Sequence, residues 1–166
     1  MSERLPERID PLLLVRAEQR LQGALPIAEF GRLNDLLFDR EGMVFFDLWF
    51  RKEGRVDAIV GHVQAHLTLQ CQTCLQAVRW DVDRVVNLGI AGSLDEASLL
   101  PPAYEPLLVE TQHTALRDIV EDELILDLPL IARHSACKTT VTLHQESLPK
   151  ERPFAVLSKL RTFGGQ

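Results

Sequence analysis

The chain has 166 residues, enough for one domain with a hydrophobic core, and its 46% hydrophobic and 25% charged residues exclude general disorder. The formal net charge of −6 is uneven, because residues 133–166 carry six basic and only two acidic side chains. An acidic body with a basic end does not provide a broad phosphate-binding surface. Direct contact with nucleic acid would therefore have to use the C-terminal part or a local patch.

The N-terminal segment and the cysteines indicate a cytoplasmic protein without a membrane partner. No apolar run approaches the roughly 18–20 residues that cross a membrane. The opening MSERLPERID carries charges of both signs where a secretory signal has its apolar stretch. In the cytoplasm the three cysteines are expected to be reduced. Their odd number also excludes a fully paired set of disulfides within one chain.

Two helices are predicted in the N-terminal part. In DPLLLVRAEQRLQG, Asp10 can cap a helix that has Pro11 at its first position and ends at Gly23. In PIAEFGRLNDLLFD, residues 26–39, apolar side chains recur at helical spacing. This predicts a second short helix, which Gly31 weakens.

The middle of the chain is typical of an antiparallel sheet. Residues 43–50, 54–63, 63–70 and 78–83 are rich in β-branched and aromatic residues or alternate apolar with polar side chains. Such alternation indicates a half-buried sheet with one wet face, and the short links predict a meander. The sequence CQTC, residues 71–74, then falls in a hairpin turn.

A loop and the clearest helix of the chain follow the predicted sheet. Prolines and a glycine mark residues 92–106 as a loop. In TALRDIVEDELILDLP, Thr114 can cap the helix and Pro129 ends it. The predicted apolar stripe comprises Leu116, Ile119, Val120 and Leu124, and the residues expected to face away from it are Asp118, Glu121 and Asp122.

These elements predict an α+β fold: an antiparallel meander of about five strands with flanking helices, a long helix after the sheet and a short C-terminal helix. Residues 1–142 are expected to form a single α+β domain. Residues 143–166 are expected to form a connector and a basic helix, in which RPFAVLSKLR is short and amphipathic.

Four residues have the chemistry of a metal site. Cys71 and Cys74 stand at the spacing of a zinc knuckle, and His134 and Cys137 form a second pair with the same spacing. Together they make a Cys3His set that would hold a structural zinc ion with all positions filled. The alternative is that the cysteines are reduced, partly buried residues and the histidine is a surface side chain. A redox pair is disfavoured, because a strand pattern follows the CxxC where a redox motif has a helix.

The sequence holds no glycine-rich phosphate loop, no GxSxG and no HExxH. His62 and His66 would stand about 13 Å apart on one strand face, too far to share a metal. Glu121, Asp122 and Glu123 are interpreted as a solvated helix face. A non-enzymatic binding or assembly protein is therefore favoured. The alternative is a zinc-dependent or RNA-processing hydrolase, with a water-bearing metal and a nearby base.

Several segments, in order, resemble the YceD family: LTLQCQTCLQAV, LPPAYEPLLVE, LRDIVEDELILDLPLIARH, the following Cys137 and the terminal RPFAVLSKLR. The N-terminal third resembles the family only in layout. Some members look like zinc ribbons with a second CxxC after the acidic helix. This chain has His134 and Cys137 at the corresponding place, and a histidine in place of a cysteine preserves zinc chemistry.

The resemblance implies a cytoplasmic factor without enzymatic activity that is needed for synthesis, processing or stability of large-subunit (23S) ribosomal RNA. It would act on that RNA directly or through a protein partner, such as a ribosomal protein or an assembly or processing factor. We expect the apolar side chains of the C-terminal helix to fold back onto the core, and Lys159 and Arg161 to contact the partner.

Overall fold

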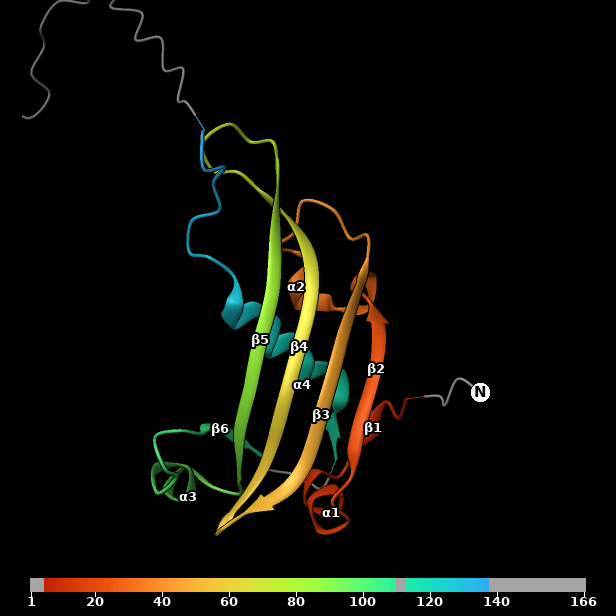
Figure 1. Cartoon of the computed structure of the whole chain (residues 1–166), viewed down its shortest axis with the longest axis vertical. Coiled ribbons are helices and arrows are strands. Elements are labelled where there is room, and N and C mark those ends of the chain that lie inside the picture. The colour runs from red at the N-terminus through yellow and green to blue at the C-terminus, as the bar shows by residue number, and fades with distance from the viewer. Residues whose placement is uncertain (1–4, 110–112, 138–166) are drawn as a thin grey trace, which may run out of the picture.

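The fold is given by a computed structural model (Figure 1), which describes residues 5–109 and 113–137. The expected connector and C-terminal helix, with Lys159 and Arg161, lie outside the described residues. The sheet, the long helix and the cysteine turn all lie within them.

One five-stranded sheet dominates the structure, with the strand order β2-β3-β4-β5-β6. Its strands are β2 (Arg20–Pro26), β3 (Met43–Glu53), β4 (Val56–Gln70), β5 (Ala77–Ala91) and β6 (Glu105–Leu108). The first four form an antiparallel meander, whereas β6 pairs with β5 in parallel. The predicted α+β class and the size of the sheet are confirmed, but the sheet is not antiparallel throughout.

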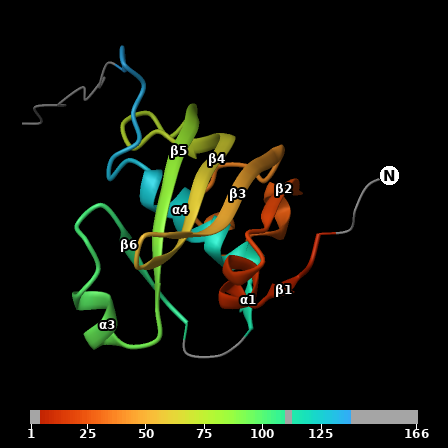
Figure 2. The same cartoon turned by 60° about the horizontal axis from the view of Figure 1, so that its bottom comes forward.

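The helix α4 (Leu116–Asp127) lies across one face of this sheet, behind β3, β4 and β5 in Figure 1 and beneath the sheet in Figure 2. Its buried side chains share one core with those of the strands. The shorter helices are α1 (Pro11–Arg16), the 3-10 helix η1 (Ile27–Glu29), α2 (Gly31–Asn34) and α3 (Leu94–Ser98). A ribbon of β1 (Arg8–Ile9) and β7 (Thr114–Ala115) holds the N-terminal segment beside the start of α4. Within the described ranges, no helix has both the length and the apolar character needed to cross a membrane.

The first predicted helix begins where expected but ends early. The Asp10 carboxylate accepts a hydrogen bond from Leu13 N–H at 3.0 Å and so caps α1. The helix ends at Arg16, Glu18 turns the chain with a φ of 48°, and Gly23 lies inside β2 rather than at a helix end. Pairing with β3 along the whole of β2 satisfies the backbone groups that face β3, which outweighs the weak local preference for a helix.

Three other predicted elements are divided, joined or replaced. The helix expected at residues 26–39 is two short turns, η1 and α2, which are separated at Phe30. The stretches 54–63 and 63–70 form the single strand β4. The expected loop at 92–106 contains α3 and the start of β6, because a strand parallel to β5 needs a crossover connection.

The long helix confirms its predicted apolar stripe, since Leu116, Ile119, Val120 and Leu124 are all buried. Thr114 does not cap it. That residue belongs to β7, and the N-cap position is held by Ala115 without a side-chain hydrogen bond. Pairing of β7 with β1 fixes the entry of the chain into α4 instead. The helix ends two residues before Pro129, as a proline stop requires.

Candidate metal centre

Cys71, Cys74, His134 and Cys137 lie together at one end of the sheet. One ligand atom from each lies within 4.8 Å of every other. The first two belong to the turn between β4 and β5, and the other two to the segment that follows α4. Figure 1 shows this turn and this segment side by side at the top of the molecule. The structure therefore brings together the four residues that the sequence had singled out.

The turn that carries Cys71 and Cys74 is shaped by its own backbone. The N–H of Cys71 donates to the Gln76 carbonyl at 2.9 Å, and the N–H of Leu75 donates to the Cys71 carbonyl at 2.8 Å. Leu75 adopts a φ of 61°, an uncommon conformation for a residue with a side chain. The chain therefore reverses tightly after Cys74, which keeps both sulfur atoms on the same side.

His134 is held in the orientation of a metal ligand. Its Nε2 lies 2.9 Å from the carbonyl oxygen of Ala77 at the start of β5. When Nε2 carries the proton and donates to this oxygen, Nδ1 has a free lone pair. That Nδ1 lies 3.5 Å from the Cys74 sulfur. The hydrogen bond to Ala77 thus selects the tautomer and directs the other nitrogen into the cluster.

The distances fit a tetrahedral zinc ion. Ligand bonds of about 2.3 Å to sulfur and about 2.0 Å to nitrogen place two sulfurs about 3.8 Å apart and a sulfur and a nitrogen about 3.5 Å apart. The Cys71 and Cys137 sulfurs are 3.8 Å apart. The 3.5 Å between Cys74 and His134 matches as well. All three cysteines are free thiols in the structure.

The electrostatics of the thiols also suit a cation. Hydrogen bonding from the Cys74 backbone, assisted by that of His134 and Thr73, lowers the pKa of the Cys71 thiol to about 5. Burial and the nearby Cys74 and Cys71 sulfurs raise the pKa of Cys137 to about 11. Ionisation of the Cys71 thiol is therefore favoured, whereas ionisation of the Cys137 thiol is opposed by the neighbouring sulfurs. A bound divalent cation would remove that opposition.

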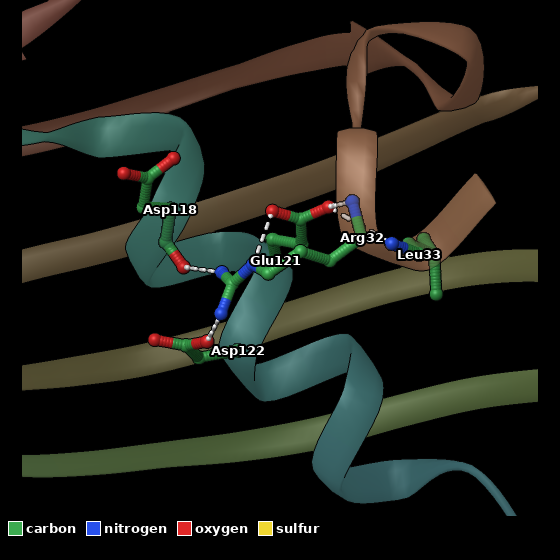
Figure 3. Close-up of polar contacts among 5 residues, drawn as sticks. All are labelled: Arg32, Leu33, Asp118, Glu121 and Asp122. Carbon is green, nitrogen blue, oxygen red and sulfur yellow. Dashed lines mark hydrogen bonds and ion pairs between the residues drawn. The ribbon is translucent and has the colours of Figure 1, made fainter. Parts of the chain in front are cut away.

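The long helix carries two carboxylates that the sequence had placed in solvent and that are in fact buried. The Glu121 side chain reaches from α4 to the start of α2 and accepts hydrogen bonds from Arg32 N–H at 2.7 Å and Leu33 N–H at 2.9 Å (Figure 3). Its other oxygen accepts from Arg32 Nε at 3.0 Å. Glu121 is 3% exposed, so the predicted solvated face is wrong at this position.

Glu123 is the second buried carboxylate. It pairs with Arg84 Nε at 2.9 Å, and the same guanidinium reaches Glu105 on β6 at 2.7 Å. Burial raises the pKa of Glu123, and the hydrogen bond from Arg84 partly opposes the shift. Both carboxylates thus have structural partners in the described part of the chain.

The arginine partners, Arg32 and Arg84, were not singled out from the sequence. One signal could have located Glu123: it follows Ile119 by four residues and Val120 by three, which is the spacing of one helix face. No comparable signal identifies the arginines, because α2 and β5 meet α4 only in the folded chain.

Other predicted positions are confirmed. His62 and His66 are exposed on the polar face of β4. His66 Nδ1 lies 2.6 Å from an Asp81 carboxylate oxygen on β5. These histidines belong to the wet face of the sheet, away from the Cys3His cluster.

Comparison with known proteins gives one family. A family model described as large ribosomal RNA subunit accumulation protein YceD matches residues 59–161. A curated relative of the same name from Haemophilus influenzae is 34% identical over 110 residues, which cover 61% of this chain and 63% of the relative. The match therefore spans less than two thirds of that relative's length. No solved structure matches the chain.

Proposed function

Because the family match covers residues 59–161, the chain belongs to the YceD family of large ribosomal RNA subunit accumulation proteins, and we propose that it supports the accumulation of large-subunit ribosomal RNA in the cytoplasm. The observation that carries this proposal is the extent of the match. It includes most of β4, all of β5 and α4, and all four members of the Cys3His cluster.

The direct test is the ratio of 23S to 16S RNA in cells from which the gene for this chain has been deleted. The proposal expects a lowered ratio that a plasmid copy of the gene restores. An unchanged ratio would contradict the proposed function.

We propose a non-enzymatic role for the Cys3His cluster, in which four protein ligands hold one structural zinc ion. A zinc hydrolase keeps one coordination position open for water, whereas a Cys3His set fills all four. The buried carboxylates of α4 are paired with arginines, which argues against the alternative of a zinc-dependent or RNA-processing hydrolase. Zinc would thus clamp the β4–β5 turn to the segment after α4.

The clamp has a calculable effect on stability. The Cys71 and Cys137 sulfurs are 66 residues apart in sequence, and closing a loop of this length is worth about 4 kcal/mol in the chain-entropy account of cross-links. Cys71→Ser with Cys74→Ser should therefore lower the free energy of unfolding by about that amount in zinc-containing buffer. Thr73→Ser, in the same turn, is the matched control. A double variant that unfolds like the parent chain would refute the clamp.

Charge favours a protein partner over an extended RNA surface. The first 132 residues are acidic, so they suit a basic ribosomal protein or an assembly or processing factor better than a phosphate backbone. We propose that residues 1–142 form one domain and that residues 143–166 form a connector and a basic helix. Lys159 and Arg161 of that helix would contact the partner or RNA.

Affinity capture at native expression levels distinguishes the two modes of action. A protein partner that survives RNase treatment supports an adaptor. Precursor large-subunit RNA that disappears with RNase, without any retained protein, supports direct RNA binding. Lys159→Glu with Arg161→Glu should reduce the captured material several-fold, whereas Arg16→Glu, a basic residue on α1, should leave it unchanged. Equal capture by the double variant and the parent chain would contradict the role of these two residues.

A further inference from the structure

A groove lies between α4 and the edge strand β6, on the face of the sheet that carries α4. Its volume is about 270 Å³. Leu88 of β5, Leu107 of β6 and Ile119 and Leu126 of α4 form its apolar wall. Its charged lining residues are Arg32, Glu105, Asp122 and Glu123. We call it the α4–β6 groove.

The groove is a part of the helix-bearing face that the described residues leave uncovered. Leu126, which is part of the wall, is 60% exposed, and Leu107 is only partly buried. Leu88 and Ile119 are buried beneath, so the apolar surface open to an occupant is that of Leu126 and Leu107. Exposed apolar side chains with a polar margin are typical of a surface on which another element packs.

The rim of the groove has an excess of negative charge. Three carboxylates line it, those of Glu105, Asp122 and Glu123, against the single cation Arg32, and these groups pair with Arg32 or with Arg84 beside the groove. The rim carboxylates Asp122 and Glu105 have side chains that are 52% and 54% exposed. An occupant with an apolar side and positive charges would be complementary to this surface.

The chain itself contains such a segment outside the described residues. In RPFAVLSKLR the apolar residues Phe154, Leu157 and Leu160 recur every third position, and the basic residues are Arg152, Lys159 and Arg161. The family match ends at residue 161, so this segment and both walls of the groove belong to one matched unit.

The connection is long enough for the segment to reach the groove. The described chain ends at Cys137, whose sulfur lies 3.8 Å from that of Cys71 beside the β4–β5 turn at one end of the sheet (Figure 1). The residues from 138 to 152 can span roughly 50 Å when extended, at about 3.3 Å per residue. Leu88 in the groove lies eleven residues along β5 from Ala77 at that turn, which is roughly 36 Å at about 3.3 Å per residue and within the reach of the connection.

We propose that residues 153–161 dock in the α4–β6 groove of the same chain, with Phe154, Leu157 and Leu160 against the apolar wall and the basic side chains at the acidic rim. Lys159 and Arg161 then lie at a solvent-facing margin, where they remain accessible to a partner. This docking goes beyond the proposed function and does not depend on it.

The test places the photo-crosslinking residue p-benzoylphenylalanine at position 154 of the full chain. After irradiation, we expect an adduct within the monomer that mass spectrometry maps to β6 or α4. Leu126→Asp should lower the adduct yield about tenfold. It places a charge in the apolar wall, and a cost of about 1.4 kcal/mol lowers the docking equilibrium constant tenfold. Leu13→Asp on α1 is the matched control, since Leu13 is also 60% exposed, and should leave the yield unchanged.

Three outcomes would overturn the proposal. One is an adduct that joins two chains, which would assign the groove or the segment to a second copy. Another is an intramolecular adduct on elements other than β6 and α4. The third is the absence of any adduct within the chain. Because ribosomal RNA levels are not part of this readout, its failure would leave the proposed function standing.

Discussion

Replacing Glu121 by alanine should destabilise the protein more than a change at its exposed neighbour Asp122. The substitution removes the acceptor for two backbone N–H groups at the start of α2, those of Arg32 and Leu33. It also removes the partner of Arg32 Nε. The rest of α4 keeps its apolar stripe, so the effect isolates one contact between α2 and α4.

The expected magnitude follows from the burial of these groups. A buried N–H without an acceptor costs about 1–3 kcal/mol, and the Leu33 N–H is buried whereas that of Arg32 is only partly so. The Arg32 side chain is 55% exposed, so its ion pair adds at most about 1 kcal/mol. Glu121→Ala should therefore lower the free energy of unfolding by about 2–4 kcal/mol, a large part of the roughly 5–15 kcal/mol of a typical domain.

Urea unfolding followed by fluorescence or circular dichroism measures this change. Glu121→Gln keeps a neutral acceptor and should cost about half as much. Asp122→Asn, whose parent side chain is largely exposed, should cost less than about 1 kcal/mol.

Arg32→Ala separates the two contributions of Glu121, because it removes the guanidinium and leaves both backbone N–H groups with their acceptor. It should cost less than Glu121→Ala. Equal losses for these two variants would show that the ion pair is the stabilising element. A loss below about 0.5 kcal/mol for Glu121→Ala would show that Glu121 does not stabilise the contact between α2 and α4.

Two other predictions concern single side chains. Asp10→Ala removes the cap of α1 and should lower the free energy of unfolding by about 1 kcal/mol, whereas Asp10→Asn should retain most of it; equal stability of the alanine variant and the parent would contradict the capping role. The pKa of Glu123 in the folded chain is raised above its unfolded value of about 4.3, so the native state binds this proton more tightly than the unfolded state does. The stability of the folded chain therefore falls as the pH rises above that value. Urea titrations at several pH values measure the free energy of unfolding of the parent chain relative to that of Glu123→Gln. This difference should decrease as the pH rises in this window, and an increase would mean that the pKa of Glu123 is lowered rather than raised.

The elements that the sequence predicted well depend on local periodicity. Alternation along residues 63–70 placed Val63, Ala65, Leu67 and Leu69 in the core, and all four are buried. The stripe of α4 followed from the same kind of pattern at helical spacing. The Cys3His cluster was recognised because its ligand chemistry is distinctive even when the two halves are far apart in sequence.

The errors arise where a distant partner decides the local structure. Residues 20–23 have the spacing to continue α1 as far as Gly23, but β3 provides a strand to pair with, and they form part of β2. Glu121 looks like a solvated residue until α2 brings its backbone N–H groups to the carboxylate. Such partners are set by tertiary packing, which a single sequence does not display.

The zinc content of the purified full chain under reducing conditions, determined by mass spectrometry of the metal, decides whether the Cys3His cluster is a metal centre. We expect about one zinc per chain, retained in Thr73→Ser and lost in Cys71→Ser with Cys74→Ser. Zinc far below one equivalent in the parent chain, or equal zinc in the double variant, would contradict a Cys3His metal centre.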